Sequence, residues 1–265
     1  MNEIFLAKLG LSFIIGGAWV TFATIAAERL GTKIGGIIAG APSMISIALF
    51  FIGWTQTPSF ASQATTIIPI TMGINTLFVI IYVVLSRFNF YLSILTSLIF
   101  WFTLTLLLVF LKFDNFICSI VVYIACLAFS YYILEKRMRI KSETQKNIQY
   151  SLLQLIFRIS LSGGIITLAV LMAEVGGPLF GGAFSAFPAV VLSIIILTYF
   201  AQGKSFSSAT LKVMVLGGGI SLVIYAVVVR YAYLHIGLIW GTLLAYLVSI
   251  ICAYFLYLYV RKIIS

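Results

Sequence analysis

The chain has 265 residues, of which 63% are hydrophobic and only 8% are charged, and its formal net charge is +10. Because soluble domains carry about 25% charged residues, this composition excludes a water-soluble domain and predicts an all-α, polytopic helical integral membrane protein. The basic excess does not call for nucleic acid, since cytoplasmic loops rich in Lys and Arg and contact with anionic lipid headgroups account for it.

Nine apolar segments are long enough to be membrane spans, because about 20 helical residues cross the hydrocarbon core. In chain order we expect spans at residues 4–27, 33–54, 63–86, 89–111, 115–134, 150–173, 178–200, 208–230 and 234–260. The hydrophilic stretch EKRMRIKSETQKNIQ separates the two groups of spans. We therefore expect a first membrane repeat with one extra helix (1–134), a basic cytoplasmic loop (135–149) and a second membrane repeat (150–265).

Basic residues are distributed unevenly between the two sides of this nine-span map. The connections after odd-numbered spans contain most of the Lys and Arg residues, whereas the other side holds only Lys8, Lys112 and Arg230. Arg158 lies inside the sixth span, near enough to its start to snorkel to the interface. Cytoplasmic loops carry the excess of positive charge, so we expect an inner-membrane protein with its N-terminus outside and its C-terminus in the cytoplasm.

Two stretches of the chain are nearly the same: AERLGTKIGGIIAGAP (27–42) and AEVGGPLFGGAFSAFP (173–188). An offset of 146 residues aligns four pairs, which are Glu28 with Glu174, Gly35 with Gly181, Gly36 with Gly182 and Pro42 with Pro188. Further along, a shorter offset of 143 aligns Tyr82 with Tyr225 and Arg87 with Arg230. These ordered matches at polar and loop positions indicate an internal duplication.

The duplication predicts an inverted-topology repeat. The first span matches the sixth, and this odd shift makes the two copies cross the membrane in opposite directions, as in many secondary transporters. Two assignments of the helix outside the repeat stay open: the fourth span is an insertion, or the fifth is a linker.

Each half resembles the small GlpM-type membrane proteins, which are also grouped with a domain of unknown function. The second half, FGGAFSAFPAVVLSIIILTYFAQGKSFSSATLKVMV, carries the closest likeness, with its glycines, a proline after a short apolar run and a polar loop containing Ala-Thr. The resemblance implies a duplicated and fused unit with a Gly–Pro-containing second helix. It does not name a substrate.

The repeated glycines and prolines are the first candidates for a substrate or ion site. Gly36 and Gly40 lie four residues apart on one helix face, and small residues at this spacing let helices approach closely. Pro42 and Pro188 lack an N–H and free the carbonyl four residues earlier, which is Phe184 in the second copy. Two interpretations follow: a kink packed tightly against a neighbour, or a broken helix whose backbone lines a site.

The two matched glutamates, Glu28 and Glu174, end their predicted helices. Glu28 is next to Arg29 and near Lys33, with which it can pair, whereas Glu174 has no basic neighbour in the sequence. Both are therefore interfacial residues, or they couple protons or cations to transport.

Other polar residues within the spans are candidates for contacts between helices. We expect Thr71 and Asn75 to form hydrogen bonds across helices, and Ser43, Ser46 and Ser193 to line the broken-helix region. No phosphate-binding loop, nucleophile elbow or zinc spacing is present in the sequence, so we predict no enzyme, no cofactor and no metal.

The inverted repeat and the paired Gly–Pro helices favour a secondary transporter of a small solute or ion. A passive channel on the same duplication and a non-transporting scaffold or regulatory protein are the alternatives. The expected partners are the lipid bilayer and a small molecule or ion of unknown identity, and the sequence is compatible with a homodimer.

Overall fold

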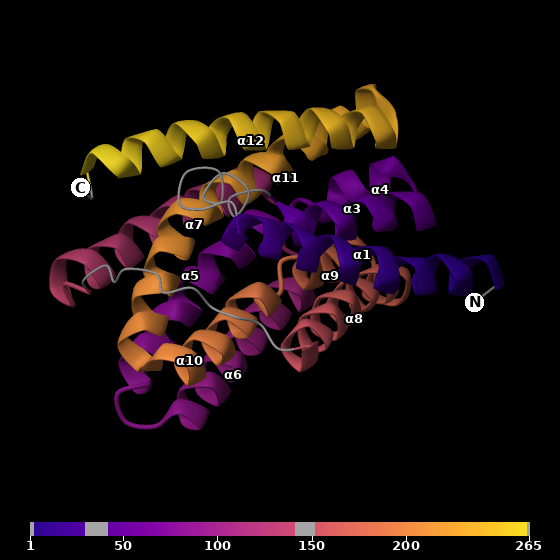
Figure 1. The fold of residues 1–265 in the computed structure, drawn as a ribbon. Helices are drawn as coiled ribbons and strands as arrows, with labels where there is room; N and C mark the ends of the chain where they lie inside the picture. The colour runs from indigo at the N-terminus through magenta and orange to yellow at the C-terminus, as the bar shows by residue number, and fades with distance from the viewer. Residues whose placement is uncertain (1–2, 30–41, 141–151, 264–265) are drawn as a thin grey trace.

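The computed structural model describes residues 3–29, 42–140 and 152–263, and these residues form helices and no strand. Figure 1 shows the helices in chain order, which are α1 (Glu3–Arg29), α3 (Ser43–Thr55), α4 (Pro58–Ala64), α5 (Ile68–Leu85), α6 (Phe90–Phe110), α7 (Phe116–Tyr131), η1 (Tyr132–Arg137), α8 (Leu152–Gly176), α9 (Pro178–Ser185), α10 (Ala189–Val213), η2 (Met214–Gly218), α11 (Gly219–His235) and α12 (Gly237–Ile263). The two η elements are π-helices.

Seven segments in the described part of the chain are long and apolar enough to cross a membrane, and two shorter apolar helices, α3 and α11, accompany them. These segments fall at the positions of the nine predicted spans. The protein is therefore a polytopic helical membrane protein, as predicted, while the number of crossings stays a prediction.

Polar side chains fix where several helices begin. The Thr57 hydroxyl accepts a hydrogen bond from the Phe60 N–H at the start of α4. The side-chain carbonyls of Asn89 and Asn115 do the same at the starts of α6 and α7. Each cap satisfies one backbone donor that has no partner within the helix, so the loops stay short and the helices return directly into the bundle.

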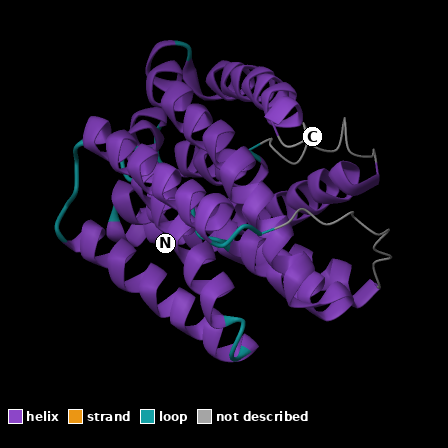
Figure 2. Cartoon of the chain, turned by 90° about the vertical axis from the view of Figure 1, so that its left-hand side faces the viewer, coloured by secondary structure: helices purple, strands orange, loops and turns teal. Residues whose placement is uncertain are grey.

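The interior of the bundle is formed by α5 and by the α9–α10 pair. The apolar windows of the segments that contain these helices are 78% and 72% buried, against 28% for α6 and 22% for α12. The outer helices expose large side chains such as Leu95 on α6 and Leu247 on α12, and Figure 2 shows the loops confined to the helix ends. Apolar faces of this extent suit contact with lipid chains rather than with water.

The helices α1 and α8 pack with their backbones in close approach. A Cβ added at Gly17 would lie 2.7 Å from the Ile159 carbonyl oxygen, and one added at Gly163 would lie 2.5 Å from the Phe13 carbonyl oxygen. These two contacts are reciprocal, because Phe13 corresponds to Ile159 and Gly17 to Gly163 at the offset of 146 residues. Reciprocal contacts of this kind are the mark of packing about a two-fold axis.

The same two helices run antiparallel. Lys8, near the start of α1, donates a hydrogen bond to the Trp54 carbonyl at the end of α3. Two residues further along, the Gln56 side chain donates to the Glu174 carboxylate near the end of α8. The beginning of α1 and the end of α8 therefore lie at one end of the bundle. We call it the opposite end, because it lies across the bundle from the end rich in basic residues described next.

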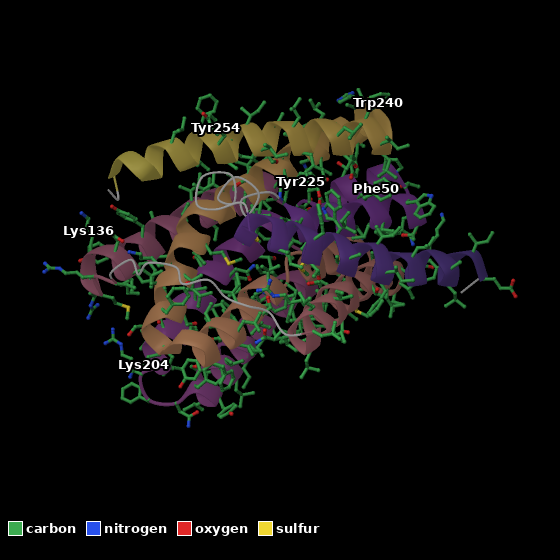
Figure 3. The ribbon with its side chains drawn as sticks, viewed as in Figure 1. Phe50, Lys136, Lys204, Tyr225, Trp240 and Tyr254 are labelled. Carbon is green, nitrogen blue, oxygen red and sulfur yellow. The ribbon has the colours of Figure 1, made fainter. Side chains whose placement is uncertain are left out.

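Basic side chains gather at the other end, which we call the basic end. Figure 3 shows Lys136 and Lys204 there, far from Phe50 and Trp240 at the opposite end. At the basic end, Lys212 of α10 donates to the Glu135 carboxylate at 2.9 Å and to the Ile140 carbonyl at 2.6 Å. The sequence predicts that the side carrying Lys136, Lys204 and Lys212 is cytoplasmic.

Three predicted spans differ from the observed helices. The predicted span over 63–86 overlaps the apolar segment Pro58–Leu85, in which a turn between Ala64 and Ile68 separates α4 from α5. The predicted span over 178–200 coincides with the apolar segment Pro178–Phe200, within which Pro188, a residue with no N–H, separates α9 from α10. The prediction over 208–230 is wrong because α10 continues to Val213 and a π-helix precedes α11, at a run of three glycines with low helix propensity. Arg158 is buried within the bundle rather than extended to the interface.

Candidate functional site

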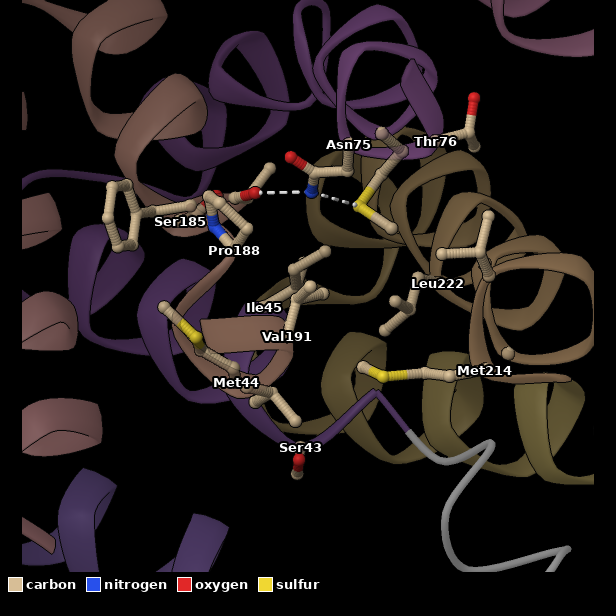
Figure 4. Close-up of a pocket in the computed structure, with 17 residues that line it drawn as sticks. Ser43, Met44, Ile45, Asn75, Thr76, Ser185, Pro188, Val191, Met214 and Leu222 are labelled. Atoms are coloured by element: carbon tan, nitrogen blue, oxygen red, sulfur yellow. Dashed lines mark hydrogen bonds between the residues drawn. The ribbon is translucent and has the colours of Figure 1, made fainter. Parts of the chain in front are cut away.

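A cavity of about 100 Å³ lies in the interior where helices are interrupted. Figure 4 shows side chains that line it from the start of α3, the middle of α5, the break between α9 and α10, η2 and the start of α11. They include Ser43, Met44, Ile45, Met72, Asn75, Thr76, Ser185, Ala186, Phe187, Pro188, Val190, Val191, Met214, Val215, Gly218, Gly219 and Leu222.

The helices α3 and α10 both begin at this cavity, and both have a proline at the N-cap. Pro42 has φ −77° and ψ 64°, and Pro188 has φ −77° and ψ 43°. From the cavity α3 runs toward the opposite end, whereas α10 runs toward Gly203 at the basic end. The 13 residues of α3 extend about 20 Å, less than the roughly 30 Å of a hydrocarbon core. Each helix therefore begins deep within the bundle.

The first backbone N–H groups of these two helices have no partner within their own helix. The first bond within each helix runs from Ser46 N to Pro42 O at 3.2 Å and from Leu192 N to Pro188 O at 2.9 Å. The N–H groups one and two residues before these donors, such as that of Val191, have no acceptor among the described residues. Helix N-termini carry a partial positive charge. The cavity therefore has two electropositive walls.

Asn75 fixes the broken backbone beside the cavity. Its side-chain N–H donates to the Ala186 carbonyl at 2.9 Å, and its side-chain carbonyl accepts from the Trp101 indole N–H at 2.7 Å. The same amide lies 3.5 Å from the Met72 sulfur. One side chain on α5 thus ties the interruption between α9 and α10 to α6.

The carbonyl freed by Pro188 is satisfied locally, which corrects one detail of the sequence interpretation. The Phe184 carbonyl accepts from the Phe187 N–H at 3.1 Å in a tight turn. The carbonyl that takes a partner from another helix is instead that of Ala186. A tight turn at the break satisfies the Phe184 carbonyl, and the carbonyl that accepts from another helix lies two residues later in the sequence.

The predicted site residues fall into three groups. Pro188 lines the cavity, and Pro42 is buried directly before Ser43, which also lines it. Gly181 and Gly182 are packing positions outside the lining, because a Cβ would overlap Ala173 of α8 at the first and the Ala64 carbonyl at the second. The remaining glycines of the motif, Gly35, Gly36 and Gly40, lie outside the described residues.

The two matched glutamates are not at the cavity lining. Glu174 is exposed at the opposite end, where Gln56 donates to it. Glu28 lies in α1, and its side chain is outside the described residues. Since α1 and α8 are antiparallel, the helix ends that carry the two residues lie at opposite ends of the bundle.

Of the predictions for the other polar residues, some are confirmed and others are wrong. Asn75 bonds across helices as predicted, but Thr71 donates to the Ile67 carbonyl of its own helix at 2.9 Å, so that prediction is wrong. Ser43 lines the cavity, whereas Ser193 bonds its own helix and does not. Sequence reasoning missed Trp101; its position in the middle of the predicted span 89–111, away from the interface where Trp is common, could have suggested a buried partner for its N–H.

These features define a class, namely a polytopic helical membrane protein with interrupted helices around an interior cavity. The model of a protein family described as "Protein of unknown function (DUF3147)" matches residues 9–114. The matched region is in the first half of the chain, although the closest likeness to GlpM-type proteins was predicted for the second. No curated protein and no solved structure matches the chain.

Proposed function

We propose that the protein consists of two copies of one unit, related by an axis in the membrane plane. Three observations support this inverted repeat: the reciprocal glycine contacts of α1 and α8, their antiparallel packing, and the matching N-cap prolines of α3 and α10. The resemblance to single-unit GlpM-type proteins is consistent with such a fusion. The axis passes between α1 and α8.

The cavity lies where the two proposed units meet. Its lining contains pairs of residues at the offset of 146, such as Met44 with Val190, Ile45 with Val191 and Thr76 with Leu222. Equivalent positions from both copies therefore face one space. In transporters with inverted repeats, the substrate site lies near the membrane midplane at the repeat interface, beside discontinuous helices.

We infer from this arrangement that the protein is a secondary transporter of a small solute. The single observation that carries the inference is the convergence of two proline-capped helix starts on one interior cavity. Their backbone N–H groups suit an anionic or strongly electronegative group on the solute. The apolar lining from Met44, Val191 and Leu222 suits a small carbon skeleton. Transport, rather than catalysis, is the proposal.

The proposed orientation places the basic end in the cytoplasm, because cytoplasmic loops carry the excess Lys and Arg. In a cysteine-free background, Lys136→Cys should react with a membrane-impermeant thiol reagent only from the cytoplasm. Thr57→Cys should react only from outside. Labelling of both positions from one side would contradict the orientation.

A cavity-filling substitution tests the transport proposal. Purified protein is placed in liposomes, and uptake is measured with a panel of small carboxylates and inorganic anions. We expect saturable uptake of at least one anion, with counterflow, and we expect Val191→Trp to abolish it. Leu95→Trp, at a lipid-facing position, is the matched control and should transport normally. Flux without saturation or counterflow would favour a channel, and wild-type flux in Val191→Trp would refute the site.

Pro188→Ala separates a structural kink from a functional break. Alanine restores an N–H at the interruption, so continuous helix competes with the turn that presents the Ala186 carbonyl to Asn75. We expect the variant to fold and to transport several-fold more slowly. Unchanged uptake would leave the proline as a packed kink.

The coupling role of Glu174 is tested by Glu174→Gln. If the carboxylate couples protons to transport, the variant should lose the pH dependence of uptake while its expression is unchanged. Wild-type uptake at every pH would identify Glu174 as an interfacial residue.

A further inference from the structure

A second cavity, of about 330 Å³, lies at the basic end. Five of the seven residues that line it are polar or charged: Ser86, Arg87, Lys204, Ser205 and Ser208. Two of them come from the end of α5 and its following turn, and three from α10 after Gly203. Gly203 has φ +86° within α10, so the helix is interrupted and starts again at this cavity. The cavity is separate from the interior cavity described above, with which it shares no lining residue.

The two cations of this cavity have no counter-charge in the described part of the chain. Arg87 and Lys204 are both exposed, and neither contacts a carboxylate there. Glu135, a carboxylate at the same end of the bundle, is already paired with Lys212 at 2.9 Å. The cavity therefore carries two positive charges that are available to an anion.

The hydroxyl group of a largely buried serine also faces the cavity without a partner among the described residues. Ser208 is 9% exposed and lines the cavity, yet its hydroxyl makes no hydrogen bond with the described residues. The neighbouring Ser207 differs, because its hydroxyl bonds to Tyr82 at 3.1 Å. The Ser208 hydroxyl is therefore open to the cavity, where a group from outside the chain can accept a hydrogen bond from it.

The sequence-matched position at the opposite end shows what a closed arrangement looks like. Ser62 corresponds to Ser208, and its hydroxyl donates to the Arg230 carbonyl at 2.6 Å. Arg230 corresponds to Arg87, and it donates to Thr66 at 2.9 Å while lying 4.4 Å from the Phe116 ring centre. There the polar groups satisfy one another.

At the basic end Lys212 occupies the position that matches Thr66, and it bonds to Glu135 and Ile140 instead of to Arg87. Within the described residues, Arg87 and Ser208 therefore lack the hydrogen bonds that their counterparts make. The described side chains around this cavity therefore offer two cationic groups and several hydroxyl donors, and no carboxylate is among them.

We propose that this cavity binds a phosphate group. The Arg87 guanidinium matches two phosphate oxygens, Lys204 supplies a second charge, and the Ser208 hydroxyl donates to a third oxygen. The group is the headgroup of an anionic phospholipid or a phosphate in solution, since both present the same oxygens. Its place at the end rich in basic residues fits either source.

The test measures phosphate binding by the purified full-length protein in neutral detergent. One arm titrates phosphatidylglycerol against phosphatidylcholine, and the other titrates sodium phosphate against sodium chloride at equal ionic strength. Binding is followed by native mass spectrometry for the lipid and by thermal stability for both ligands. We expect Arg87→Gln to weaken binding about fivefold, as expected for one basic residue beside an anionic headgroup. Ser208→Ala, which preserves the net charge and the packing, should also weaken it.

Lys136→Gln is the matched control. Lys136 is an exposed cation at the same end that does not line the cavity, so this variant should bind as the wild type does. Binding in the lipid arm alone supports a headgroup, and binding in the phosphate arm alone supports a soluble phosphate. No binding in either arm overturns the proposal. An equal loss in Arg87→Gln and Lys136→Gln, with none in Ser208→Ala, overturns it as well, because general surface charge then explains the binding.

Discussion

Replacing Asn75 by leucine should destabilise the protein by breaking the link between α5, α6 and the interruption between α9 and α10. Asn75 is 5% exposed, and it bonds to the Trp101 N–H at 2.7 Å and to the Ala186 carbonyl at 2.9 Å. Leucine has a similar size but no polar atom. The substitution therefore leaves one donor and one acceptor without partners in an apolar interior.

The magnitude follows from the fate of these two groups. A buried polar group without a partner costs about 1–3 kcal/mol, whereas hydrogen bonds between membrane helices contribute about 0.6 kcal/mol on average. Trp101 is fully buried, so its N–H cannot turn to water or to lipid headgroups. We therefore expect Asn75→Leu to lower the free energy of unfolding by about 2–4 kcal/mol.

Reversible unfolding in mixed micelles measures this change. Thr71→Val is the matched control, because Thr71 is buried on the same helix but bonds only to its own backbone; it should cost less than about 1 kcal/mol. In Trp101→Phe the orphaned donor is already absent, so adding Asn75→Leu should cost about 1 kcal/mol less than it does in the wild type. A loss below about 0.5 kcal/mol for Asn75→Leu would refute the reasoning.

Two further predictions concern packing and charge. Gly182→Ala should destabilise the fold by more than about 2 kcal/mol, because the added Cβ overlaps the Ala64 carbonyl. Gly164→Ala is the control and should be neutral or stabilising, because a Cβ there meets nothing within 4 Å. Equal effects of the two substitutions in the same unfolding assay would argue against the close contact between Gly182 and Ala64. The Lys212 side chain is 3% exposed and the Glu135 side chain is 33% exposed. Glu135→Gln leaves a buried cation without its counter-charge, so it should reduce thermal stability more than Lys212→Met does. The reverse order would contradict a buried, charged lysine.

The class of protein was determined by the sequence alone. Membrane insertion depends on the apolarity of each segment, and apolarity is a local property that needs no tertiary contact. For the same reason Pro188 could be recognised as an interruption, since a residue without an N–H cannot continue a helix regardless of its neighbours. The internal duplication stays a prediction from the sequence, and the contacts at Gly17 and Gly163, which lie 146 residues apart, support it.

Only the tertiary structure decided which polar residues matter and where. Thr71 and Asn75 lie one helical turn apart on α5, yet one bonds its own helix and the other crosses to Trp101. The difference depends on side-chain length and on what packs opposite, and hydropathy records neither. Glu174 was selected by its repeated position but lies away from the interior cavity. The cavity beside Arg87 and Lys204 arises because the fold brings the end of α5 next to the interruption of α10 at Gly203, more than a hundred residues later in the sequence.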